Sequence, residues 1–179
     1  MKKALLSLLF LTILGMVSPA LAQRHNKNIS AWGAHYGRTE KGNFYEGSFT
    51  NYLTDELSVR VSGLRDFGNW RDTAEYAAFS GRVFLAPQLF QIGEVAYFHL
   101  LLGGGVSYER TQETDTGEEN GGTRRERFTY GPQAGVEVDL FFNNRISVVA
   151  NGIKGKAFNR SHIDEWPGFA SIGFRYHFR

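Results

Sequence analysis

The feature that most constrains the fold is a strict alternation of apolar and polar residues along several stretches of the chain. In residues 97–109, every second position from Phe98 to Tyr108 is apolar or glycine, and the positions between them include His99 and Glu109. A period of two places successive side chains on opposite faces of a β-strand, whereas no stretch shows the 3.6-residue period of an amphipathic helix. The pattern predicts an all-β protein.

Two further runs alternate as clearly. Residues 128–140 carry an apolar face opposite a polar one, and Pro132 within this run predicts a local irregularity because proline cannot donate to a sheet ladder. Residues 166–178 are aromatic on one face, which resembles the C-terminal strand by which outer-membrane barrels are recognised for assembly, although Arg179 follows the last aromatic residue. These runs favour a barrel in a membrane.

Weaker alternation gives a total of about eight strands, which is the smallest size that bacterial membrane barrels take. The weaker runs are residues 29–38, 44–53, 57–67, 75–85 and 146–158. We therefore expect an eight-stranded antiparallel up-and-down transmembrane β-barrel. If the N-terminus begins inside, the periplasmic connections are residues 54–56, 86–94 and 143–144. The outward connections are residues 39–43, 68–74, 110–126 and 159–165.

The first 22 residues have the form of a secretory signal. Lys2 and Lys3 precede an apolar stretch, and Ala20 and Ala22 form a small-x-small cleavage site. The apolar stretch is shorter than the roughly 20 residues that a membrane-spanning helix needs. We expect cleavage after Ala22, a single barrel domain over residues 23–179, and export to the outer membrane.

A soluble exported sandwich or a lipocalin-like barrel is the structural alternative, because its strands also alternate but point the apolar face inward. Charged residues in the middle of the runs argue against it, since a small membrane barrel would pair them inside. We expect a structural cluster of charges in the lumen. Its predicted members are Arg60, Arg82, His99, Glu137, Asp139, Arg175 and His177.

The composition limits the chemistry that the chain could perform. There is no cysteine, so thiol catalysis and thiolate metal sites are excluded, and the five histidines show no paired metal-ligand spacing. The chain has 20 basic and 18 acidic residues, and two of the basic ones, Lys2 and Lys3, lie in the signal. This balance does not indicate a nucleic-acid surface. We expect no catalytic residue, no metal and no cofactor.

Ser161 and His162 stand beside Asp164 in an outward connection, and some small outer-membrane barrels are lipid A hydrolases or transferases that use Ser and His. No Gly-x-Ser-x-Gly elbow or His-x-Ser spacing is present. A solvated polar loop explains these residues better. The mixed-charge residues 110–127 are where we expect a protein partner or a lipopolysaccharide head group to be met.

Three segments carry a resemblance to a known family: residues 98–109, 128–137 and 145–156, together with Gln23 and Arg24 directly after the signal. They resemble the TraO family of conjugative-transposon transfer proteins. The resemblance implies an accessory outer-membrane protein of a conjugation apparatus, without known enzymatic residues. The mixed charge of residues 110–127 argues against direct contact to nucleic acid. A structural or adhesive barrel, a lipid A modifying enzyme and a soluble lipocalin-like binder are the alternatives.

Overall fold

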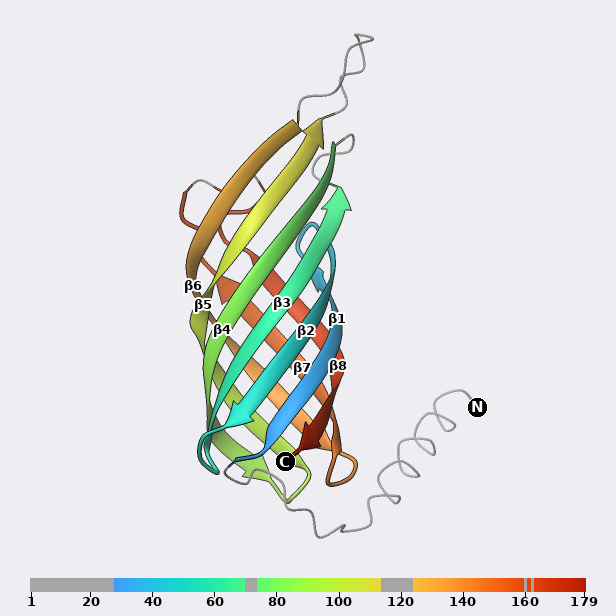
Figure 1. Cartoon of the computed structure of the whole chain (residues 1–179), viewed down its shortest axis with the longest axis vertical. Coiled ribbons are helices and arrows are strands. Elements are labelled where there is room, and N and C mark those ends of the chain that lie inside the picture. Colours follow the sequence, from blue (N-terminus) through green and yellow to red (C-terminus); the bar gives the residue numbers. More distant parts are fainter. Residues whose placement is uncertain (1–27, 70–73, 114–123, 160, 162) are drawn as a thin grey trace, which may run out of the picture.

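The computed structural model describes residues 28–69, 74–113, 124–159, 161 and 163–179, and it forms a closed barrel in which all strands are antiparallel and follow chain order (Figure 1). This confirms the predicted fold class. The expected signal, residues 1–22, lies outside the described residues. The strands are β1 (Ser30–Thr39), β2 (Gly42–Tyr52), β3 (Leu57–Asn69), β4 (Ala74–Ile92), β5 (Ala96–Glu113), β6 (Arg124–Phe141), β7 (Ile146–Gly155) and β8 (Gly168–Phe178).

The barrel closes where β1 pairs with β8, in an unbroken register from Ser30 opposite Phe178 to Thr39 opposite Phe169. Closure leaves no exposed edge along this seam, which is what a sheet needs when no water is present to bond its backbone. Within the described residues, no helix is long and apolar enough to cross a membrane.

The two faces of the wall differ in the way that a membrane barrel requires. Large apolar side chains point outward, such as Trp32 and Phe174, which are 60% and 67% exposed. Polar and charged side chains point inward, and Arg60 and Asp139 are both 0% exposed. A soluble barrel would have the opposite arrangement, with the apolar face inside. The inverted faces therefore decide against the lipocalin-like alternative.

The two ends of the barrel are unequal. The end that holds the start of β1 and the close of β8, which we name the terminal end, has three tight connections at residues 53–56, 93–95 and 142–145. At the opposite end, which we name the distal end, β4, β5 and β6 rise beyond the other strands (Figure 1). The connection from β7 to β8, residues 156–167, also lies at the distal end.

The predicted connection over residues 86–94 is wrong, because β4 continues through this stretch to Ile92. Pro87 remains opposite Leu57 of β3, and the register against β5 shifts between Gln88 and Phe90. An extra residue on one strand is a β-bulge, which disturbs the alternation without ending the strand. The actual turn is residues 93–95, where Gly93 adopts a φ of 58°.

The predicted outward connection over residues 110–126 is also too long. β5 extends to Glu113 and β6 starts at Arg124, with Gln112 opposite Arg124. Both strands here rise above the rest of the barrel, so their two faces meet similar surroundings and the apolar alternation fades. Residues 114–123 of this predicted connection lie outside the described residues, as do residues 70–73 of another.

The irregularity expected at Pro132 occurs where β7 ends. The amide of Lys156 donates to the Pro132 carbonyl at 3.0 Å, but proline has no N–H to return the bond. The regular ladder between β6 and β7 therefore stops at Gln133 opposite Gly155, and one isolated bridge follows between Tyr130 and Phe158. As a result, β7 ends earlier than the predicted 146–158, and β8 begins at Gly168 rather than at 166.

Candidate functional site

A chain of ion pairs crosses the lumen from β2 and β3 to β6 and β8. On its first side, the Arg60 guanidinium of β3 donates through Nη2 to Oε1 of Glu46 at 2.7 Å. Its Nη1 donates to Oε2 of Glu137, which comes from β6. Arg60 therefore links two carboxylates that belong to non-neighbouring strands.

On the second side, Arg175 of β8 binds the two buried carboxylates of β6, Glu137 and Asp139. Its Nη2 donates to Oε1 of Glu137 at 2.7 Å, and its Nη1 donates to Oδ2 of Asp139 at 2.7 Å. Nη1 also lies 3.4 Å from the Tyr52 hydroxyl. Glu137 is thus the centre of the network, because each of its oxygens accepts from a different guanidinium.

Burial makes this network energetically demanding. The side chains of Arg60, Glu46, Glu137, Asp139 and Arg175 are each at most 3% exposed. Removing a charge from water costs several kcal/mol, and only close, well-bonded partners of opposite sign offset that cost. The network is therefore stable only when its members remain paired. We name these five residues the lumen network.

Arg82 lies apart from the lumen network. Its guanidinium carbon sits 3.7 Å from the centre of the Phe169 ring and 5.9 Å from that of Phe44. Among the described residues, none of its three side-chain nitrogens has a hydrogen-bond partner, although the residue is only 1% exposed. The guanidinium of Arg82 therefore makes cation–π contacts with these rings, where the predicted charge cluster would give it a hydrogen-bonded carboxylate.

The two predicted histidines border the lumen network. His99 stands opposite Glu137 in the register of β5 and β6. His177 shares a 3.0 Å hydrogen bond with the Ser147 hydroxyl, and its ring lies 4.8 Å from that of Phe141. The structure buries all seven residues of the predicted cluster, and ion pairs join four of them, Arg60, Glu137, Asp139 and Arg175.

Glu46 is the member of the lumen network that the predicted cluster omits. The signal is present, because a carboxylate in the middle of an alternating run has no place on a lipid-facing wall. The alternation does not indicate which side chain pairs with this carboxylate. Glu46 lies opposite Leu64 in the register, and Arg60 lies opposite Thr50. The contact between Glu46 and Arg60 therefore runs diagonally between the neighbouring strands β2 and β3.

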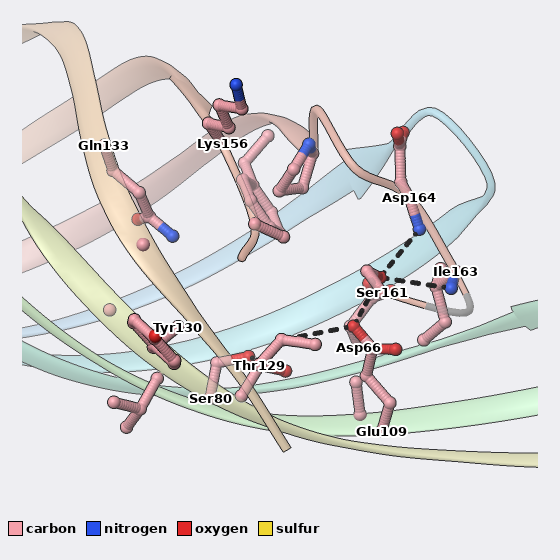
Figure 2. A pocket seen from close by; sticks show the side chains of 18 residues that line it. Asp66, Ser80, Glu109, Thr129, Tyr130, Gln133, Lys156, Ser161, Ile163 and Asp164 are labelled. Atoms are coloured by element: carbon pink, nitrogen blue, oxygen red, sulfur yellow. Dashed lines mark hydrogen bonds between the residues drawn. The ribbon is translucent and has the colours of Figure 1, made fainter. Parts of the chain in front are cut away.

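A second polar region lies above the network, near the distal end. A cavity of about 60 Å³ lies here, and its wall includes Asp66, Glu109 and Asp164 together with several hydroxyl groups (Figure 2). Oε1 of Glu109 accepts from the hydroxyls of Thr129 at 3.2 Å and Ser161 at 2.6 Å. We name this region the distal chamber. Here two hydroxyl groups donate to Glu109, whereas two guanidinium groups donate to Glu137.

Ser161 shapes the connection that covers the distal chamber. Its Oγ donates to Glu109 and accepts from the amides of Ile163 at 3.2 Å and Asp164 at 3.0 Å (Figure 2). A hydroxyl bonded in this way closes a turn. His162, the other residue considered for nucleophilic chemistry, lies outside the described residues.

Comparison with known proteins rests on structure. No protein-family model and no curated protein matches the chain. The barrel is similar to a major outer membrane protein of Thermus thermophilus, with a TM-score of 0.68, 12% identity, and coverage of 84% of this chain and 99% of that one. The N-terminal barrel domain of Pseudomonas aeruginosa OprF gives a TM-score of 0.63 at 12% identity, covering 85% and 98%.

Ail, the attachment invasion locus protein of Yersinia pestis, solved in complex with the heparin analogue sucrose octasulfate, is also similar. Its TM-score is 0.57 at 14% identity, and the match covers 85% of this chain and 99% of that one. Identities this low establish a shared fold and nothing further. The chain therefore has the fold of the small eight-stranded outer-membrane β-barrels.

Proposed function

We propose that this protein is a closed, non-enzymatic barrel of the bacterial outer membrane that serves as an accessory component of a conjugative DNA-transfer apparatus. The lumen network is the observation that supports a closed interior. The resemblance of residues 98–109, 128–137 and 145–156 to the TraO family supports the conjugative role. Such a barrel acts through protein and lipid contacts at its rims, because its interior is occupied.

The lumen network supports a closed interior through its position. Arg60 of β3 and Arg175 of β8 come from strands that β1 and β2 separate, and Glu137 of β6 bonds to both of them across the lumen. An eight-stranded barrel has an interior just wide enough for side chains to fill. An ion would have to break buried pairs to pass, at a cost of several kcal/mol for each uncovered charge.

Conductance measures the closed state of the barrel directly. The full barrel is inserted into a planar lipid bilayer, and current is recorded under an applied voltage. We expect no steady single-channel current from the natural protein. A stable open level in most insertions would contradict a closed barrel. The conjugative role does not depend on this result and is tested by a separate measurement.

That measurement is the transfer frequency of a donor strain from which the gene has been cleanly deleted. We expect transfer to recipients to fall while growth of the donor is unchanged, and to return when the natural chain is supplied from a plasmid. Unchanged transfer in the clean deletion would contradict the conjugative role. Recovery of the protein in the soluble periplasmic fraction, rather than in the outer membrane, would contradict the location.

An adhesive barrel is the second candidate, and the raised ends of β5 and β6 favour it. Arg110 and Arg125 are exposed on this ribbon beyond the other strands. Ail, which has the same fold, was solved with a sulfated sugar. A deletion that lowers surface binding but leaves transfer unchanged would select this candidate.

Lipid A modification is less well supported, because the Ser161 hydroxyl is already engaged with Glu109 and two backbone amides. A nucleophilic serine needs an oxygen lone pair that is free to attack, and the Ser161 oxygen already accepts from two backbone amides. Mass spectrometry of lipid A tests the point. A mass change in cells carrying the natural chain, lost in His162→Ala, would favour the enzyme.

A further inference from the structure

Three basic side chains lie close together on the outer face of the barrel near the distal end. Arg38 of β1 is paired with Ala170, Lys154 of β7 is paired with Gly168, and Lys156 follows on the same face of the chain. Two strand spacings and two residues along β8 separate Arg38 from Lys154, which is roughly 12 Å between Cα atoms. We name Arg38, Lys154 and Lys156 the basic cluster.

Small residues form the floor between these cations. Gly168 and Ala170 lie on the outer face of β8 between β1 and β7, so no large side chain separates Arg38 from Lys154. A Cβ added at Gly168 would lie 3.3 Å from the Lys154 ammonium. The long basic side chains can therefore converge above β8.

Lys156 is placed among aromatic rings at the same site. Its ammonium lies 5.0 Å from the Trp166 ring and 5.9 Å from the Phe158 ring, and both rings are exposed. Cation–π contact holds the ammonium in place while leaving it free to bond an anion. Charge and exposed apolar surface thus meet side by side, as they do at a membrane interface.

Acidic side chains also border the cluster: Glu40, in the connection between β1 and β2, and Asp164, which interacts with Glu40. The Glu40 carboxylate bonds to the Lys154 ammonium, and this contact holds the pKa of Glu40 below its ordinary value. Both side chains are more than half exposed, so the pair is weak and exchangeable. A stronger anion could replace Glu40 on Lys154.

We propose that the basic cluster binds the phosphate groups of an outer-leaflet glycolipid, the lipid A portion of lipopolysaccharide. This rests on the proposed location in the outer membrane and does not depend on a role in conjugation. The phosphates bond to Arg38, Lys154 and Lys156, and the acyl chains lie against the apolar wall below them. Outward-facing Tyr36 and Ile172 continue that wall.

The position of the cluster favours a lipid over a soluble polyanion. The three cations point outward from the same wall that exposes the apolar residues of β8, and they do not stand on the raised ribbon of β5 and β6. A membrane-embedded ligand reaches such a site from the side. The terminal end, by comparison, carries exposed Asp55, Glu56 and Glu94, which would repel phosphate.

The test compares charge-matched variants of the full barrel refolded in phosphatidylcholine vesicles. Arg38→Gln with Lys156→Gln removes two cations of the cluster, and Arg145→Gln with Arg179→Gln removes two at the terminal end. Binding of diphosphorylated lipid A is followed by the change in tryptophan fluorescence. We expect the first pair to weaken binding by about thirtyfold, since each of the two interfacial cations contributes on the order of 1 kcal/mol, and the second pair to leave binding unchanged.

Two further measurements identify the ligand chemistry. Dephosphorylated lipid A should bind about as weakly to the natural barrel as diphosphorylated lipid A binds to the first pair. Glu40→Gln should tighten binding several-fold because it frees Lys154. Equal losses in both charge-matched pairs would overturn the assignment of the site. Equal binding of soluble sucrose octasulfate, without competition from lipid A, would overturn the assignment to a lipid.

Discussion

The lumen network and the distal chamber are both polar regions inside one barrel, but they hold their carboxylates in different ways. In the network, Glu137 is almost fully buried and bonds to two guanidinium groups. In the distal chamber, Glu109 is also buried, yet it accepts hydrogen bonds from the hydroxyls of Thr129 and Ser161. The network depends on full charges in pairs, whereas in the chamber hydroxyl groups donate to the buried carboxylate.

The difference shows how position along the barrel sets the cost of a charge. The network lies between lipid-covered walls, where an uncompensated ion loses its hydration without replacement. The chamber lies toward the distal mouth, where the covering segment is a connection rather than a strand. Substitutions in the network should therefore lower the free energy of unfolding of the whole barrel. Substitutions in the chamber should change only the local opening of one connection.

Glu137→Ala should give the largest effect. The substitution leaves two buried guanidinium groups short of a partner, and uncompensated buried charges cost about 3–5 kcal/mol of unfolding free energy. Urea unfolding of the barrel in vesicles, followed by heat-modifiable gel mobility, measures the loss. Glu126→Ala is the matched control, because Glu126 is an exposed partner of Arg110 and should cost less than about 1 kcal/mol. Similar losses in the two variants would contradict the special position of the network.

Arg60→Met should have the next largest effect, and a second substitution should recover some of the loss. The single variant leaves Glu46 buried without its guanidinium partner. Adding Glu46→Leu removes that isolated charge and should restore about 2 kcal/mol of unfolding free energy, as expected for directly contacting residues. The double-mutant cycle is measured by the same urea unfolding. Strict additivity of the two single losses would show that Arg60 and Glu46 are not coupled.

Arg82→Met should change the free energy of unfolding by less than about 1 kcal/mol. The guanidinium contacts Phe169 and Phe44, and its loss removes a cation–π attraction of about 2 kcal/mol. The substitution also removes the cost of burying a cation without a bonded carboxylate, which is of similar or larger size. Urea unfolding beside Arg60→Met gives the comparison. A loss as large as that of Arg60→Met would mean that Arg82 belongs energetically to the network.

Much of the barrel could be predicted from the sequence, because each membrane-spanning strand has a face toward lipid and a face toward the lumen. The alternation around Val136, Glu137 and Val138 states this directly, and the structure places Val136 outward and Glu137 inward. The signal is lost where a residue is inserted or where both faces meet the same solvent. For this reason the sequence predicts connections at the β4 bulge near Gln88 and at the raised ends of β5 and β6, where the structure has strands.

The pairing inside the lumen could not be predicted, because it depends on the stagger between strands. Arg60 and Glu137 are far apart in sequence and become partners only after the barrel has closed with its particular register. Likewise, alternation does not predict that the guanidinium of Arg82 contacts the Phe169 ring without a hydrogen bond to a carboxylate. Alternation specifies which face a side chain occupies, but closure specifies which side chains meet.

Ser161→Ala should give the smallest and most local effect. The hydroxyl accepts from the amides of Ile163 and Asp164, so its loss should speed hydrogen exchange at those two amides by about fivefold, equivalent to about 1 kcal/mol of local opening. The urea midpoint should remain nearly unchanged, because the lumen network is intact. Thr54→Ala provides the control at the terminal end, where the Thr54 hydroxyl accepts from the Glu56 amide at 3.3 Å. Exchange that accelerates throughout the barrel in Ser161→Ala would show that the distal chamber and the lumen network form a single cooperative unit.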